Sequence, residues 1–223
     1  MFNFGGGMLT GSEIERQIKK GNIKITPYDP ECINPNSYNL KLHPQLKVYK
    51  RGSRNGRADI LPYFSDAHDP NVIRECPYLE GCQLDPIDMH KDNETVEITI
   101  PKEGFVLMPG VLYIGRTVER TASNKFIPMI NGRSSGGRLG ISVHVCAGFG
   151  DIGFDGTWTL EITVVEPVIV YPNEEIAQVC YFKPYGRNDR LYMGRYQNQV
   201  DATASRFFKP KTITEKLSKY ISI

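Results

Sequence analysis

The sequence predicts a mainly β fold, and three observations support this prediction. From Glu94 onward, short runs of residues alternate between apolar and polar with the period of two that a half-buried strand requires. Turn-forming glycine, proline and asparagine separate these runs at regular intervals. Helical spacing is confined to one stretch near the N-terminus. Regularly spaced short strands with one early helix favour a closed barrel or a jelly roll over a parallel α/β sheet.

The one expected helix begins near Thr10. Thr10 and Glu13 stand at the spacing of a capping box, in which the two residues satisfy each other's backbone amides. Ile14 and Ile18 recur at helical spacing and would share one buried face. Gly21 supplies the stop signal, so the sequence predicts a single short helix.

Strands are expected wherever apolar and polar residues alternate. The first expected strand passes through Tyr38, Leu40 and Leu42, after a proline-rich stretch. Further strands are expected at 96–100, 105–108, 111–115, 125–130, 141–145, 157–165, 168–170 and 176–182. Pro109 and Gly110 predict a tight turn between 105–108 and 111–115.

Residues 8–223 are expected to form a single domain, with 1–7 as an N-terminal extension. Periodicity fails between Lys50 and Asn93, where glycine, proline and mixed charges predict an insertion loop (50–93), with or without a short central strand. The C-terminal part, 184–223, begins basic, aromatic and poor in aliphatics. Such a lid and tail either drapes over the surface or closes over a ligand.

Composition excludes several functional classes. The chain of 223 residues is 40% hydrophobic, which can fill a core, and its net charge is +2. Balanced acids and bases give no extended positive field, so we expect no nucleic-acid binding and only local phosphate binding. No apolar run approaches the span of a bilayer, and the N-terminus lacks the features of a signal peptide. The expected location is the cytoplasm, without membrane association.

The cysteines are odd in number and irregularly spaced, which fits reduced thiols better than a disulfide framework. They are Cys32, Cys76, Cys82, Cys146 and Cys180. Cys76 and Cys82 lie in one expected loop and could pair or hold a metal, but no second cysteine or histidine pair stands nearby to complete a zinc tetrahedron. Unpaired loop thiols are the favoured interpretation.

The stretch from Asn131 to Glu161 carries the chemistry. Its glycines, whose backbone amides can close around an anion, are Gly132, Gly136, Gly137 and Gly140. Arg133 and Arg138 add positive charge between them, which suits a phosphate. On the strand that follows, Glu161 is the only acid on the polar face of 157–165.

Each of these features has a simpler explanation. A glycine-rich loop between strands is usually just solvated, and a glutamate on a polar strand face usually just contacts water. An anion cradle, cationic charge and a lone carboxylate within one short segment are, however, the components of a nucleotide-processing site.

Five motifs stand in a fixed order along the chain. They are MLTGSEIERQIKKGNIKITPYDPECINPNSYNLKL from Met8, GFVLMPGVLYIGRTVE from Gly104, NGRSSGGRLGISVHVCAGFGDIGFDGTWTLEI from Asn131, YPNEEIAQVCYF from Tyr171 and GRYQNQVDATASR from Gly194. Together they resemble the dCTP deaminase family of the dUTPase superfamily. The resemblance covers most of the chain outside Lys50–Asn93 and the two ends.

This resemblance implies a dUTPase-like, distorted jelly-roll β-barrel and a homotrimer with sites between neighbouring subunits. It also implies deamination of dCTP to dUTP and ammonia in the supply of dUMP and dTTP precursors, with dTTP as a possible feedback inhibitor. Mg²⁺ would be bound through the nucleotide triphosphate. Zinc is not expected, because zinc deaminases need H-x-E and P-C-x-x-C, and neither is found here.

The resemblance also implies roles for individual residues. Glu161 would activate the attacking water, Ser134 would hydrogen-bond near it, and Arg138 would orient Glu161 and keep it ionised. The backbone around Val145, Cys146 and Ala147 would read the cytosine edge. Arg133, Ser135, Tyr185, Arg195 and Gln199 would contact the phosphates, and Asp151 would lie beside the deoxyribose.

Several alternatives remain at this point. Phe149 follows the branch of the family with AGF, which includes enzymes that also hydrolyse the triphosphate, and Asp151 could then activate a second water to give dUMP and diphosphate. A dUTPase alone would need Asp151 but has no use for Glu161. A non-catalytic nucleotide-binding trimer would keep the arginines and serines without the acid.

Four positions depart from the family pattern. Cys146 stands where threonine is common, Asn39 where aspartate is frequent, and Gly150 and Ile152 where isoleucine and proline are usual.

The segment from Arg195 to Arg206 is too poor in aliphatics to bury itself. We therefore expect it to be mobile without ligand and to close over the triphosphate.

Overall fold

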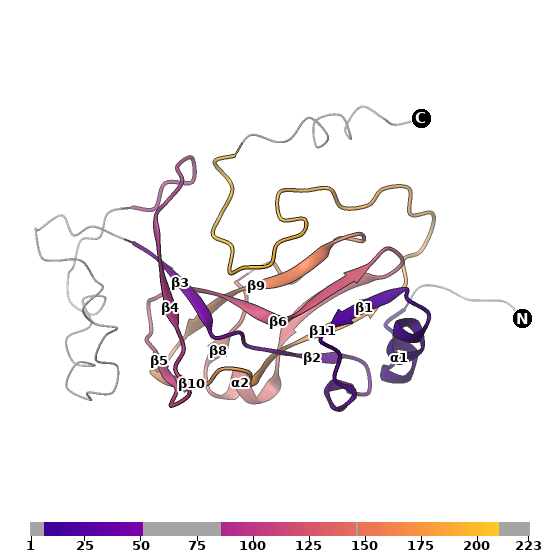
Figure 1. Cartoon of the computed structure of the whole chain (residues 1–223), viewed down its shortest axis with the longest axis horizontal. Helices are drawn as coiled ribbons and strands as arrows, with labels where there is room; N and C mark the ends of the chain where they lie inside the picture. The colour runs from indigo at the N-terminus through magenta and orange to yellow at the C-terminus, as the bar shows by residue number, and fades with distance from the viewer. Residues whose placement is uncertain (1–6, 51–85, 146, 210–223) are drawn as a thin grey trace, which may run out of the picture.

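The computed structural model describes residues 7–50, 86–145 and 147–209 and confirms the expected mainly β fold (Figure 1). The elements in chain order are α1 (Gly11–Lys19), β1 (Ile23–Thr26), the 3₁₀ turn η1 (Pro30–Cys32), β2 (Tyr38–Lys41), β3 (Gln45–Tyr49), β4 (Thr95–Thr99), β5 (Phe105–Leu107), β6 (Tyr113–Ser123), β7 (Ile127–Gly132), α2 (Ser134–Arg138), β8 (Ile141–Ser142), β9 (Asp155–Val164), β10 (Val168–Val170) and β11 (Glu175–Phe182). Cys76, Cys82 and Cys146 lie outside the described residues, as does most of the expected 50–93 insertion.

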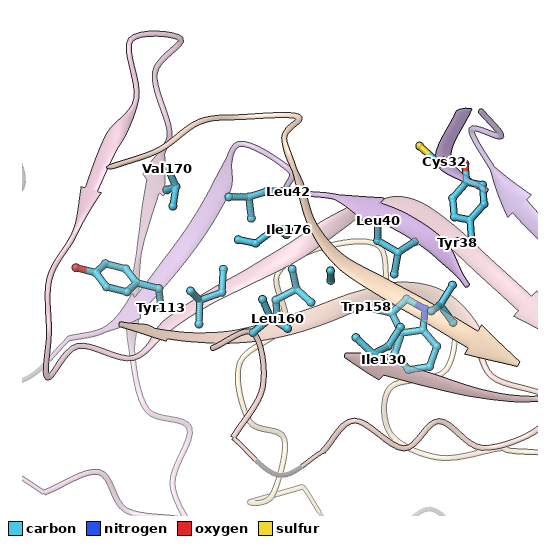
Figure 2. Packing of buried hydrophobic residues seen from close by; sticks show 14 of the residues in the cluster. Cys32, Tyr38, Leu40, Leu42, Tyr113, Ile130, Trp158, Leu160, Val170 and Ile176 are labelled. Atoms are coloured by element: carbon cyan, nitrogen blue, oxygen red, sulfur yellow. The ribbon is translucent and has the colours of Figure 1, made fainter. Parts of the chain in front are cut away.

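The strands form three antiparallel sheets. The largest has the order β4-β3-β6-β9-β8, with β1 paired to β6. A second has the order β2-β11-β7, and β10 pairs with β5 in the third. Figure 2 shows Leu40 and Ile176 from the second sheet in the same buried cluster as Trp158 and Leu160 from the first. Closure of these sheets into a jelly roll and the domain bounds 8–223 remain predictions.

The N-terminal helix forms where the sequence predicts it. Thr10 caps α1, accepting a hydrogen bond from the Glu13 amide at 3.4 Å, and Gly21 beyond the helix adopts φ +71°. The capping box is only half made, because the Glu13 carboxylate bonds Arg16 and Gln17. These bonds, Arg16 first, lower the pKa of Glu13 to about 2.

The turn at Pro109 and Gly110 is present, and Gly110 has φ +79°. The strands on its two sides nevertheless enter different sheets: β5 pairs with β10, whereas β6 pairs with β1, β3 and β9. Local turn chemistry predicts a chain reversal, but strand partners depend on contacts distant in sequence. The two strands that we did not expect, β1 and β3, also pair with β6.

The C-terminal segment, residues 190–205, runs along β9 of its own chain (Figure 1). The Asn198 amide donates to the Asp155 carbonyl at 2.8 Å, and the Thr157 amide donates to the Gln199 carbonyl at 2.9 Å. Further along, the Thr203 amide donates to Thr159 Oγ1 at 3.4 Å. The segment thus covers this strand, and its motion on ligand binding remains a prediction.

A close approach of β7 and β9 explains why Gly150 departs from the family pattern. The Gly150 amide donates to the Pro128 carbonyl at 2.9 Å. A Cβ at this position would lie 2.3 Å from Trp158 Cη2 and 2.8 Å from Pro128 Cγ. With tryptophan at 158, a branched side chain at 150 has no room.

Gly150→Ala should therefore destabilise the protein, because Trp158 or Pro128 must move to admit the methyl group. Overpacking of this kind costs about 1–3 kcal/mol, equivalent to a fall in melting temperature of roughly 2–10 °C. Gly137→Ala is the matched control, because no atom lies within 4 Å of a Cβ there and the site is helical. Equal melting temperatures for the two variants in calorimetry would contradict this explanation.

Candidate active site

A cavity of about 610 Å³ lies between β9, the loop that follows β8, and the C-terminal segment. Six of the residues expected to form the site line it: Val145, Ala147, Phe149, Asp151, Glu161 and Gln199. An adjoining cavity of about 570 Å³ shares Phe149, Gly150, Asp151 and Tyr192 with it. The structure therefore gathers the carboxylates and the loop expected to contact the base around one space.

Strand alternation points Glu161 into this cavity. Its neighbours Leu160 and Ile162 are buried in the core, so Glu161 faces the other side of β9. The Val145 amide donates to Glu161 Oε2 at 3.4 Å. Asp155, at the start of β9, is also half-buried, but it forms an ion pair with Arg120 at 2.6 Å. No ion pair to Glu161 occurs within the described part of the chain.

The loop that carries Val145 is attached to β7. His144 Nε2 lies 3.3 Å from Asn131 Oδ1, and the Ile130 amide donates to the Gly148 carbonyl at 2.7 Å. Phe149 forms a β-bridge with Met129 and remains 77% exposed. These contacts hold the loop backbone beside Glu161, where its amides and carbonyls can contact a ligand.

Gln199 closes the cavity from the C-terminal segment. Its side chain is 8% exposed, and Nε2 donates to the Thr157 carbonyl at 2.8 Å. Its Oε1 is buried and finds no hydrogen-bond partner among the described residues. A free acceptor suits a hydroxyl group of a ligand better than a phosphate oxygen, so the expected phosphate contact would require this amide to turn.

The expected phosphate cradle forms a short helix. The Gly137 amide donates to the Arg133 carbonyl at 2.9 Å, which closes the turn of α2. Ser134, Ser135 and Arg138 are exposed on α2 and do not line the cavity. In Figure 1, α2 lies at the lower edge of the molecule, level with β10, whereas the C-terminal segment runs above β9. One chain alone therefore does not bring these residues together with Glu161.

Two further residues expected to contact the phosphates, Arg195 and Tyr185, do not line the cavity. Arg195 packs with its guanidinium carbon 5.8 Å from the centre of the Phe207 ring, and its Nε is buried without a partner among the described residues. Tyr185 is 93% exposed. Neither residue contacts the cavity in this arrangement.

Sequence reasoning missed three tyrosines that line the cavity. Tyr192 and Tyr196 come from the C-terminal segment, and Tyr49 comes from the end of β3. Tyr192 also packs against Phe154, with ring centres 5.9 Å apart. The aromatic richness of the C-terminal segment was the available signal for two of them. Tyr49 carries no such signal, because it precedes a stretch without periodicity.

The described residues contain no group of three or more histidine, cysteine, aspartate or glutamate side chains that could hold a metal ion. Asp151 does supply an exposed carboxylate at the cavity, and carboxylate oxygen suits a hard cation such as Mg²⁺.

Among the described residues, no helix combines the length and hydropathy needed to cross a bilayer.

Comparisons with known proteins identify the family. The family model described as dCTP deaminase-like matches residues 8–71 and 66–183. A Hathewaya histolytica protein named dCTP deaminase, dUMP-forming is 42% identical over 202 residues, which cover 91% of this chain and 98% of the relative. A Clostridium beijerinckii protein of the same name is 44% identical over 91% of this chain and 97% of its own length.

A weaker likeness appears among solved structures. The crystal structure of 2'-deoxycytidine 5'-triphosphate deaminase from Agrobacterium tumefaciens matches 80% of this chain with a TM-score of 0.49 and 21% identity, and the match spans 48% of that structure. The family model and the sequence relatives suffice without it. On their evidence, the chain belongs to the dCTP deaminase-like family.

Proposed function

We propose that this enzyme, a hydrolase, deaminates dCTP to dUTP and ammonia, in the supply of precursors for dUMP and dTTP. The observation that carries the proposal is the position of Glu161, a carboxylate without an ion-pair partner in the described chain, in a cavity lined by Val145 and Ala147. Family membership supports the same substrate, since both relatives compared above are named dCTP deaminases. Feedback inhibition by dTTP remains a prediction.

Glu161 acts as the base. It takes a proton from water as the water oxygen adds to C4 of cytosine, and it delivers that proton to N3. The hydroxyl proton of the tetrahedral intermediate then moves to the amino group, the C4–N bond breaks, and ammonia leaves. The backbone near Val145 and Ala147 contacts the cytosine edge. No zinc takes part in this scheme.

Glu161→Gln should reduce kcat by at least about 10²-fold, because the amide keeps the size of the side chain but cannot accept the proton. The dissociation constant for dCTP should stay within about threefold, since ground-state contacts are preserved. Ammonia release and dCTP binding, measured separately, check both statements. Glu166→Gln is the matched control, because Glu166 is exposed just beyond β9. Substantial turnover by Glu161→Gln would remove Glu161 from its role.

The site is completed by a second copy of the chain in a homotrimer. This part of the proposal is supported by α2, whose residues Ser134, Ser135 and Arg138 face solvent away from the cavity of their own chain. A neighbouring subunit would bring these residues to Glu161. Arg133 and Ser135 then contact the phosphates, with Arg195 and Tyr185 as further candidates, while Ser134 and Arg138 contact the water and Glu161.

Two inactive variants should complement each other if the site is shared. Glu161→Gln and Arg138→Ala should each be inactive alone. When they are refolded together in equal amounts, about a quarter of the sites should combine an intact Glu161 with an intact Arg138. Ammonia release by the mixture measures this fraction. Inactivity of a mixture whose trimers are intact in sedimentation would contradict a shared site.

Hydrolysis to dUMP is a second candidate activity, favoured by the position of Asp151. This carboxylate lines both cavities and could activate a second water for attack on the α-phosphate. The relatives compared above carry the name dUMP-forming. Mg²⁺ bound with the triphosphate would neutralise charge on the phosphate oxygens, and Asp151 could contribute one oxygen ligand.

Incubation with dCTP and Mg²⁺, followed by chromatography, separates these activities. The wild-type protein should release dUMP, and Asp151→Asn should lower dUMP formation by at least about 10²-fold while dUTP still appears, because the second water loses its base and Glu161 is unchanged. Asp189→Asn is the control, an exposed acid that lies outside both cavities. Release of dUTP alone by wild-type protein would exclude the second activity, and release of neither product would exclude both.

A further inference from the structure

A polar cluster outside both cavities surrounds the side chain of Arg133, where β7 leads into α2. Arg133 Nη1 lies 2.7 Å from Glu175 Oε2 in an ion pair, and it donates a hydrogen bond to the Glu175 carbonyl at 3.2 Å. One residue of β11 therefore contacts this nitrogen with both its carboxylate and its backbone carbonyl. Arg133 is 34% exposed and Glu175 28%, so solvent only partly weakens the pair.

Glu175 is itself held in place by other side chains. Asn39 Nδ2 donates to the same Oε2 at 2.9 Å, and the Cys32 thiol donates to Oε1 at 3.6 Å. Asn39 is buried, and its Oδ1 accepts from Asn34 Nδ2 at 2.7 Å. Burial raises the pKa of Cys32 to about 11, so the thiol remains a donor at neutral pH. The carboxylate of Glu175 therefore has fixed partners on both oxygens.

The backbone of β11 contributes to this arrangement. The register between β11 and β2 shifts between Glu175 and Ala177, and such irregularities change the direction in which a side chain points. Further along the same strand, Gln178 Nε2 donates to the Gly132 carbonyl at 3.0 Å. Two side chains of β11 thus hold the two consecutive residues, Gly132 and Arg133, that lead into α2.

The contacts to Glu175 leave one edge of the guanidinium free. Arginine has five N–H donors in a rigid plane, and Glu175 contacts only Nη1. Nε and Nη2 have no hydrogen-bond partner among the described residues. These two nitrogens form the edge that binds a carboxylate or a phosphate in two parallel hydrogen bonds.

We propose that Glu175, fixed by Asn39, is a positioning residue that holds Arg133 with this outer edge presented to the triphosphate of the substrate. The inference rests on the proposed function, in which Arg133 contacts a phosphate. A free arginine side chain loses rotamer freedom when it binds, and an arginine already held at one corner loses less. Glu175 therefore acts on nucleotide affinity and leaves the chemistry at C4 unchanged.

Asn39 is part of the same arrangement of side chains. Aspartate is frequent at this place in the family pattern, but beside Glu175 it would set two carboxylates at the 2.9 Å separation that now joins amide and carboxylate. Like charges at this distance do not both remain ionised in a part-buried site. Asn39 supplies the donor that Glu175 requires.

Two substitutions at position 175 separate positioning from simple charge. Glu175→Asp keeps the charge but shortens the side chain, so the carboxylate should no longer reach Arg133. Kd and KM for dCTP should then rise about tenfold. Glu175→Gln keeps the length and the acceptor, so both constants should stay within about threefold. In each variant kcat should stay within about twofold. A purely electrostatic role predicts instead that Glu175→Asp binds dCTP like the wild-type protein and that Glu175→Gln binds it more tightly, because only glutamine removes a negative charge from beside the phosphates.

Controls distinguish this role from general destabilisation. Glu174→Asp, at the exposed neighbouring position, should leave Kd, KM and kcat unchanged. Asn39→Asp should weaken dCTP binding as Glu175→Asp does, and adding Glu175→Gln to it should restore much of the affinity by removing the second carboxylate. A loss that melting temperature tracks in all variants, with kcat falling alongside affinity, would indicate a structural role and overturn the inference.

The same titrations keep this inference distinct from the proposed function. Tight dCTP binding by wild-type protein with an unchanged Kd in Glu175→Asp overturns the positioning role alone. Failure of the wild-type protein to bind dCTP overturns the proposed function and this inference with it. A tenfold loss of tripolyphosphate binding in Glu175→Asp, parallel to the loss for dCTP, supports the assignment to the phosphates.

Discussion

The pairing of β6 with β9 is the constraint on which the site depends. Its register places Ile114 opposite Glu161 and Tyr113 opposite Ile162, and both Ile114 and Glu161 line the cavity. Because side chains alternate across a sheet, a shift of one residue would turn Glu161 into the core and expose Ile162. Burial of a charged carboxylate without a partner costs several kcal/mol, so the hydrophobic face of β9 fixes where its acid points.

This pairing contains an irregularity that side chains repair. The register shifts between Arg116 and Arg120, and within that interval Thr117 Oγ1 accepts a hydrogen bond from the Trp158 amide at 3.0 Å. Thr121 Oγ1 accepts from the Trp158 indole at 2.8 Å. The Thr117 hydroxyl thus satisfies a backbone donor within the bulge, and the Thr121 hydroxyl satisfies the buried indole. Trp158, held in this way, is also the side chain that excludes a Cβ at Gly150.

The polar groups of this protein form two separate sets. The first set, carboxylates and aromatic rings that can contact a base and a sugar, lines the cavity, and the second set, Arg133 and α2 with their supports on β11, lies outside it. The separation of Glu161 from Arg133 and α2 suits the proposed site shared between subunits. The buried amide of Asn39 and the carboxylate of Glu175 stabilise this second set only as a connected network, because each would lose a partner if the other changed.

The sequence by itself determined the β class, the helix at Thr10, most strands after Glu94 and the outward direction of Glu161, because these follow from local periodicity and capping. The motif order also predicted that Asp151, Val145 and Gln199 belong to the site, and the structure places all three in the cavity lining. Only the tertiary structure decided that the strands flanking Pro109 and Gly110 join different sheets, that Tyr49 reaches the cavity, and that Arg133 is held by Glu175. These contacts join residues far apart in the chain, and their formation depends on which sheets pack together rather than on any local pattern.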